Sequence, residues 1–265
     1  MEGQPMVEVR AVHEDTESLG SYVPVPGFGI LPVNAFIVRA EQPLLVDTGA
    51  IVMKDAFMPA LRSAIDPADI RWLWLTHTDP DHIGSLAAIM AEAPNARIIT
   101  TFLGTGKLGL FGFPVDRVYL VNPGQSMSIG DREIVAIKPP SFDAPESTGF
   151  IDSKTRAFFC VDCFGALMSE PAATAADIPE AQLRDGLVTW ATVDAPWLQM
   201  VDEERFDRSL EIVRQLDASV VLSSHLPPAR GMTKTLLGLL REAHDAPSFI
   251  GPDQAALERM MATMA

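Results

Sequence analysis

The densest group of chemically active side chains in the sequence is the run His-Thr-Asp-Pro-Asp-His at residues 77–82. It follows a short apolar run at residues 71–75, which is typical of a buried strand. Packing alone does not select this mixture, because buried carboxylates need partners or a cation. Alternating imidazole and carboxylate groups on a tight turn can instead converge on one metal ion or on two neighbouring ions. The four candidate ligands are His77, Asp79, Asp81 and His82. The alternative is a solvated turn in which Asp81 caps a helix.

The elements predicted around this run alternate between strands and helices. Strands are expected at residues 33–39, 43–46, 71–75, 97–101, 117–121, 127–129, 133–137, 149–151, 156–161 and 219–222. Helices are expected at residues 52–65, 84–93, 203–216, 233–244 and 252–264. Strands followed by helices, twice over, predict an α/β protein of two αβ units packed sheet to sheet. Residues 164–200 are less periodic, and we interpret them as a lid or an insertion.

The order of the polar motifs resembles the metallo-β-lactamase superfamily. Residues 77–82 are similar to its His-x-His-x-Asp-His motif, and three further strand-end motifs follow the expected order: Val-Asp-Thr-Gly-Ala at 46–50, Cys-Val-Asp at 160–162 and Ser-Ser-His at 223–225. The resemblance covers residues 30–240. It implies an αββα four-layer sandwich in a single domain over residues 1–265, with two metal ions on loops at the open edge of the sheets.

The same resemblance implies roles for three more residues. Asp47 would be the strand-end carboxylate that orients the metal ligands. Asp162 would bridge both metal ions, and His225 would be the last imidazole ligand.

Two departures from the hydrolase pattern point to one branch of the superfamily. Asp79 stands where the hydrolases have a second His, and residues 139–150 contain no His, so that Asp143 is the nearest candidate there. Residues 143–147 and the stretch Asp-Cys-Phe-Gly at 162–165 resemble the oxygen-binding diiron protein (ODP) and flavodiiron branch. The ligand set implied is His77, Asp79 and Asp143 on one metal, Asp81, His82 and His225 on the other, and Asp162 between them.

This ligand set and branch lead to two functional hypotheses. Three imidazoles with four carboxylates favour iron, with manganese and zinc as alternatives. The first hypothesis is a di-iron protein that binds, senses or reduces dioxygen or nitric oxide, with electrons from a separate donor because no flavin domain is present. The alternative is a metal-dependent hydrolase of an ester, lactone or phosphodiester, in which Asp81 orients the nucleophile or takes its proton. The branch also implies a homodimer.

Four aromatic residues are candidates for the wall of the pocket. Tyr22 and Phe28 belong to a stretch rich in Pro and Gly before the first core strand, which commonly overhangs the site in this fold. Trp190 and Trp197 fall where the branch places a helix beside the metal pocket. Ordinary core packing is the alternative for all four.

Several weaker motifs are interpreted structurally. Cys160 and Cys163 are expected to be buried, unreactive thiols. The glycine-rich stretch at residues 104–109 lacks the residues of a phosphate loop and is expected to be a flexible turn. His13 and His244 are expected to be exposed and without a metal role.

The charge balance of the chain limits its partners. Its 265 residues include 20 Lys and Arg against 35 Asp and Glu, a formal net charge of −15. Such a surface repels phosphate backbones and anionic lipids, which argues against nucleic-acid and membrane binding. The chain has two cysteines, and the sequence shows no recognisable signal peptide and no run of about 20 consecutive apolar residues. These features favour a cytoplasmic protein.

Overall fold

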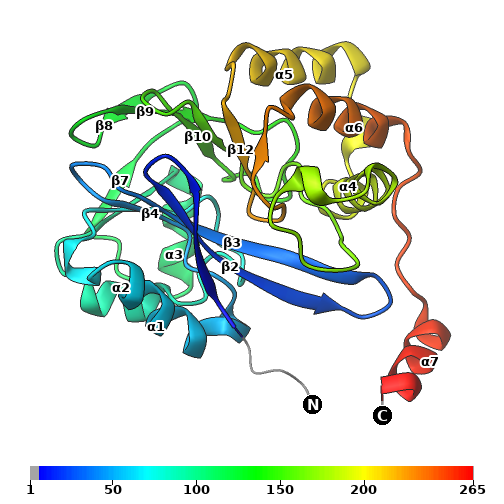
Figure 1. Cartoon of the computed structure of the whole chain (residues 1–265), viewed down its shortest axis with the longest axis horizontal. Coiled ribbons are helices and arrows are strands. Elements are labelled where there is room, and N and C mark those ends of the chain that lie inside the picture. Colours follow the sequence, from blue (N-terminus) through cyan, green and yellow to red (C-terminus); the bar gives the residue numbers. More distant parts are fainter. Residues whose placement is uncertain (1–5, 265) are drawn as a thin grey trace.

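A computed structural model describes residues 6–264 and contains two mixed β-sheets that face each other (Figure 1). The first sheet has seven strands in chain order: β1 (Glu8–His13), β2 (Thr16–Val25), β3 (Gly29–Val38), β4 (Leu44–Val46), β5 (Trp72–Trp74), β6 (Arg97–Thr100) and β7 (Val118–Leu120). Neighbouring strands are antiparallel from β1 to β4 and parallel from β4 to β7.

The second sheet has six strands in the order β13-β12-β11-β10-β9-β8. They are β8 (Ser126–Ser128), β9 (Glu133–Ile137), β10 (Gly149–Asp152), β11 (Ala157–Phe159), β12 (Val220–Leu222) and β13 (Ala229–Arg230). The pair β11 and β12 is parallel, and the other pairs are antiparallel.

Helices cover the outer face of each sheet (Figure 1). Those on the first sheet are α1 (Lys54–Ala64), α2 (Leu86–Glu92) and α3 (Phe102–Leu110). Those on the second are α4 (Glu180–Asp194), α5 (Glu203–Gln215) and α6 (Thr233–Asp245). A last helix, α7 (Gln254–Met264), lies at the end of an extended segment away from both layers (Figure 1).

The layers follow from the alternation of side chains along each strand, which places successive residues on opposite faces. Leu45 and Leu73 pack under the helices of the first sheet, with Phe57 of α1. Their neighbours Val46 and Trp74 point the other way, into the apolar layer between the two sheets. Both faces of β4 and β5 are therefore buried, which explains their continuously apolar sequence. The αββα sandwich expected from the sequence is confirmed.

Residues 164–200, which we interpreted as a lid or an insertion, contribute to the core of the second helical layer. Leu183 and Leu187 of α4 are buried in the same apolar cluster as residues of α5 and α6. This segment therefore packs as part of the αββα sandwich.

The first two strands were not expected from the sequence. β2 contains Glu17, Ser18, Ser21 and Pro24, and this composition hides its strand character. Its ten residues pair along the whole of β3, from Thr16 opposite Val38 to Val25 opposite Gly29. Long-range pairing therefore decides the structure of this segment.

The prediction of a flexible turn at residues 104–109 is wrong, because this stretch lies inside α3. The Thr101 side chain caps the helix by accepting a hydrogen bond from the Gly104 amide at 3.2 Å. A Cβ atom on Gly104 would lie 2.2 Å from the Thr100 hydroxyl oxygen, so the helix needs a glycine there to approach β6. Burial of Leu108 stabilises the helix despite its poor intrinsic propensity.

The prediction that His13 is exposed is also wrong. Its ring is buried, with Nε2 donating to the Thr155 carbonyl at 3.0 Å and Nδ1 accepting from Arg230 at 2.7 Å. His244 is partly buried and stacks on Phe206, with ring centroids 5.2 Å apart. Neither histidine contacts the candidate metal ligands.

The two cysteines are buried and free, as expected. Burial raises the pKa of the Cys163 thiol to about 12, so this thiol is unreactive at neutral pH. Within residues 6–264, no helix combines the length and the apolar character needed to cross a membrane.

Candidate metal centre

The candidate ligands come from four segments that meet at one edge of the sandwich. His77 to His82 follow β5, Asp143 lies between β9 and β10, Asp162 follows β11 and His225 follows β12. Because β4 and β5 are parallel, and β11 and β12 are parallel, the carboxyl ends of each pair lie at the same edge of their sheet. Residues far apart in the sequence thus reach one place.

Three imidazole nitrogens converge on the carboxylate of Asp162. The Nε2 atoms of His82 and His225 each lie 3.1 Å from Asp162 Oδ1, and His77 Nε2 lies 3.3 Å from Asp162 Oδ2. All four side chains are buried. Although these atoms are close, His82 Nε2 and Asp162 Oδ1 make no hydrogen bond with the described residues. Buried polar atoms that converge without hydrogen bonds fit a site for cations.

The other ring nitrogens of two histidines are held by the protein. His225 Nδ1 donates to the Pro32 carbonyl at 2.8 Å, and His82 Nδ1 donates to Asp47 Oδ2 at 2.8 Å. Because a carbonyl oxygen only accepts, His225 must carry a proton on Nδ1. In the neutral ring, Nε2 then presents its lone pair to the cluster, which is the tautomer that a metal ligand needs.

Asp47 fits the orienting role that the resemblance implied. It ends β4 with a left-handed backbone, φ 57°, and accepts hydrogen bonds from the Thr76 amide at 2.9 Å and the Thr76 hydroxyl at 2.7 Å. These bonds are in addition to the one from His82. The Asp47 carboxylate therefore fixes both the start of the ligand loop and the orientation of one imidazole.

The loops that carry Asp162 and His225 are tied together at a strained residue. Val161 has φ 61°, which is rare for a β-branched side chain. Its carbonyl accepts from the Ser224 amide at 2.9 Å and from the Ser223 hydroxyl at 3.1 Å. Such strain persists only where the surroundings impose it, and it is common at functional sites.

The carboxylates divide the cluster into two neighbouring groups that match the expected ligand sets. One ligand atom from each of His77, Asp79 and Asp143 lies within 4.8 Å of the other two, and Asp81, His82 and His225 form a second group by the same measure. Asp81 Oδ2 lies 3.4 Å from His225 Nε2, and Asp143 Oδ2 lies 3.8 Å from His77 Nε2. Asp162 lies between the groups.

The pKa directions show how the chain balances this charge without metal ions. Burial alone would lower the pKa of His225, but the carboxylates of Asp162 and Asp81 raise it to about 9. Burial would raise the pKa of Asp162, but the three imidazoles hold it well below its usual range. The carboxylates thus favour positive charge at this place, so the donor set fits two metal ions.

The sequence interpretation missed Asp194 as part of this cluster. It is the last residue of α4, and its carboxylate lies within 4.8 Å of ligand atoms of both Asp143 and Asp162. Burial raises its pKa well above the usual value, and the charges of Asp162 and Asp143 raise it further. The only signal for Asp194 in the sequence is its position between Trp190 and Trp197, the two aromatic residues assigned to the wall of the pocket.

Asn34 is a second residue that the sequence interpretation missed. Its side-chain amide donates to the carbonyls of Ser223 and Leu226, both at 3.0 Å, and holds the turn that presents His225. A polar residue within the apolar run at 33–39 was the signal that could have found it.

The two tryptophans border the cluster, as the resemblance implied. The Trp190 ring lies edge-on to His225, with centroids 4.9 Å apart. Trp197 Nε1 donates to the Phe142 carbonyl at 2.8 Å, directly before Asp143. The first ring covers an imidazole ligand, and the second anchors the loop that carries a carboxylate ligand.

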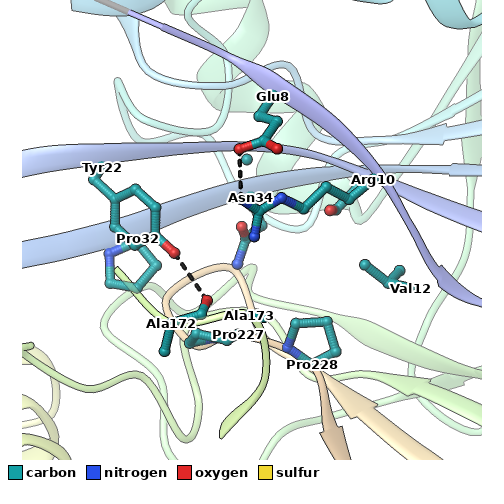
Figure 2. Close-up of a pocket in the computed structure, with 12 residues that line it drawn as sticks. Glu8, Arg10, Val12, Tyr22, Pro32, Asn34, Ala172, Ala173, Pro227 and Pro228 are labelled. Atoms are coloured by element: carbon teal, nitrogen blue, oxygen red, sulfur yellow. Dashed lines mark hydrogen bonds and ion pairs between the residues drawn. The ribbon is translucent and has the colours of Figure 1, made fainter. Parts of the chain in front are cut away.

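Tyr22 and Phe28 make their contacts elsewhere. The Tyr22 hydroxyl donates to the Ala172 carbonyl at 3.2 Å, and Tyr22 lines a cavity of about 40 Å³ together with Pro32 and Pro227 (Figure 2). Phe28 lies between β2 and β3 and packs edge-on against Phe249, with centroids 5.6 Å apart. Neither side chain has a hydrogen bond, ion pair or ring contact with the described metal-ligand candidates.

Comparison with known proteins assigns the chain to a family. A family model described as ODP family beta lactamase matches residues 31–225, well over half of the sequence. The chain belongs to this family. Its matched region runs from β3 to the final ligand candidate and includes every residue of the expected ligand set.

Relatives of this ODP family member include longer flavoproteins. The anaerobic nitric oxide reductase flavorubredoxin of Salmonella typhi is 29% identical over 134 residues, which are 50% of this chain and 28% of that protein. The chain thus spans less than a third of that relative.

Solved structures share the fold. Rubredoxin oxygen:oxidoreductase from Desulfovibrio gigas matches with a TM-score of 0.80 and 19% identity, covering 90% of this chain and 62% of that one. The flavodiiron protein from Giardia intestinalis matches with a TM-score of 0.77 and 18% identity, covering 90% and 59%.

Proposed function

We propose that this chain is a di-iron protein of the cytoplasm that binds and reduces dioxygen or nitric oxide with electrons from a separate redox partner. The observation that carries the proposal is the convergence of three buried Nε2 atoms on the Asp162 carboxylate, two of them at 3.1 Å and one at 3.3 Å. Membership of the ODP family and the names of the relatives support the choice of substrate.

We assign the residues that would hold the two ions to the same two sets as in the sequence interpretation. His77, Asp79 and Asp143 would hold one ion, Asp81, His82 and His225 the other, and Asp162 would contact both. Three imidazoles with four carboxylates form a hard donor set, which favours iron or manganese over zinc. When bound, a pair of iron ions supplies redox chemistry that no side chain of the chain can perform.

The chain's own residues would orient the site and move protons. Asp47 holds the ring of His82 and the loop residue Thr76, so the Nε2 lone pair keeps its direction. Asp81 is the catalytic residue in this proposal. Its side chain is 34% exposed and Oδ2 lies 3.4 Å from His225 Nε2, so this oxygen can pass protons between solvent and the cluster.

The proposal includes the partners that the resemblance implied. Reduction of dioxygen or nitric oxide needs electrons. A separate electron donor would supply them, and a homodimer is part of the same proposal.

Reconstitution under anaerobic conditions tests this function. The metal-free chain is loaded with iron(II), and bound iron is counted. Oxygen or nitric oxide uptake by the reduced protein is then followed with electrodes. The wild type is expected to bind two irons per chain and to take up the gas. Gas uptake should be lost in Asp162→Asn but kept in the exposed control Asp185→Asn. The alternative function as a hydrolase would be established by a different set of results. The protein would then bind two zinc ions, react with neither gas and hydrolyse a nitrophenyl phosphodiester or a lactone.

A further inference from the structure

Asp194 occupies an unfavourable place for a carboxylate. It is the last residue of α4, where the negative end of the helix dipole repels an anion. Its carboxylate also lies within 4.8 Å of ligand atoms of Asp143 and Asp162. Among residues 6–264, it has no hydrogen-bond or ion-pair partner that would offset this repulsion. A cation beside these carboxylates would relieve the repulsion.

A second observation indicates that the cluster as a whole holds cations. Asp162 Oδ1 is buried, its side chain is only 4% exposed, and this oxygen, which faces His82 and His225 at 3.1 Å, makes no hydrogen bond with the described residues. The Asp162 carboxylate is shared by the group that contains Asp194 and by the group that contains His77 and His82. On the His77 side, Asp162 Oδ2 lies 3.3 Å from His77 Nε2, and a cation held there would offset the repulsion among Asp143, Asp162 and Asp194.

The two halves of the cluster differ in what they offer a metal ion. The half around His82 and His225 has two imidazoles and Asp81. The half around His77 has one imidazole with Asp79 and Asp143, and Asp143 is 26% exposed. The half with fewer imidazoles is the one that Asp194 approaches.

We propose that Asp194 is a ligand of the metal ion held by His77, Asp79 and Asp143. This inference rests on the dinuclear centre of the proposed function, but not on its redox chemistry. Asp194 adds a carboxylate from the end of α4 to the one imidazole and two carboxylates of this half. This half of the centre is consequently rich in oxygen ligands and prefers a harder cation, such as iron(II) or manganese(II), to zinc(II).

The test compares Asp194→Asn with Asp185→Asn, a change of the same kind at an exposed position of the same helix. Each metal-free full-length protein is titrated anaerobically with iron(II), and bound metal is counted after gel filtration. Wild type and Asp185→Asn are expected to bind two ions per chain. Asp194→Asn should keep one ion at wild-type affinity and bind the other at least about tenfold more weakly.

Thermal unfolding of the same proteins separates a ligand from a structural residue. Removing one of three crowded carboxylates relieves repulsion, so metal-free Asp194→Asn should melt no lower than the metal-free wild type. The rise in melting temperature on adding iron(II) should be smaller in Asp194→Asn. If that variant does not fold, Asp194→Ser is used in the same two measurements.

Two results would overturn the inference in different ways. If Asp194→Asn binds both ions with wild-type affinity, Asp194 is not a ligand, although the dinuclear centre stands. If the wild type itself binds fewer than two ions, the dinuclear centre fails, and the role of Asp194 fails with it.

Discussion

His225 Nδ1 donates to the Pro32 carbonyl at 2.8 Å, and this hydrogen bond links a metal-ligand candidate of one sheet directly to a strand of the other. Pro32 belongs to β3 of the first sheet, whereas His225 follows β12 of the second. Proline has no backbone N–H to donate, but its carbonyl oxygen can still accept a hydrogen bond. The orientation of the last ligand therefore depends on how the two sheets pack.

Unequal metal loss is expected when Asp162 and Asp143 are compared. Asp162→Ala removes the carboxylate on which all three Nε2 atoms converge, so both ions should be lost. Asp143→Ala should lose at most one ion, because Asp143 belongs to the His77 group and not to the group of Asp81, His82 and His225. Elemental analysis after dialysis measures this, with Asp185→Ala as the exposed control. Equal losses in the two variants would show that the two carboxylates have equivalent roles.

Removal of Asp47 should weaken metal binding without removing a ligand. In Asp47→Ala, His82 Nδ1 and both donors of Thr76 lose their acceptor. Loss of such an orienting partner typically lowers metal affinity by about 10–100-fold. Each buried donor left unpaired costs about 1–3 kcal/mol of folding stability. Competition with a chelator measures the affinity, and urea unfolding of the metal-free protein measures the stability. An unchanged affinity would show that the ligand loop holds its shape without Asp47.

Metal uptake should depend on pH through His225. Its pKa in the metal-free chain is about 9, because Asp162 and Asp81 outweigh the effect of burial. Below pH 9 an incoming cation must displace a proton, so metal binding releases protons. The apparent affinity should rise with pH by up to about tenfold per unit for this one proton, and this contribution should level off above pH 9. Titrations between pH 6.5 and 9.5, with a pH indicator to count released protons, check this. No proton release at pH 7 would contradict the raised pKa.

A buried charge network at the other end of the sandwich should control stability. Arg132 is fully buried and donates to Asp152 at 2.9 Å and to Asp15 at 2.6 Å, which ties the β8–β9 turn to the β1–β2 turn. Arg132→Met leaves the buried Asp152 carboxylate uncompensated, so the free energy of unfolding should fall by about 3–5 kcal/mol. Arg62→Met breaks an exposed pair with Glu92 and should cost about 0–1 kcal/mol. Urea unfolding of both variants measures the difference, and similar losses would show that burial does not set the strength of the pair.

Local patterns were enough to predict much of the fold. The apolar strands 71–75 and 133–137 and the amphipathic helix 203–216 lie where the structure has β5, β9 and α5. Their periodicity reflects which face is buried, and that face is written into consecutive residues. The segment that became β2 and the glycine-rich α3 were missed, because their structure depends on pairing with β3 and packing on β6.

The sequence by itself determined the ligand loop and the strand-end motifs. The candidates from His77 to His82 lie within six residues, and their spacing indicates a metal site before any long-range contact is known. Only the tertiary structure decided which carboxylates join them. Asp194 follows His82 by more than a hundred residues and reaches the cluster because α4 ends there. The physical reason is that a metal site is a set of atoms converging in space, and the packing of two sheets and a helix determines that convergence.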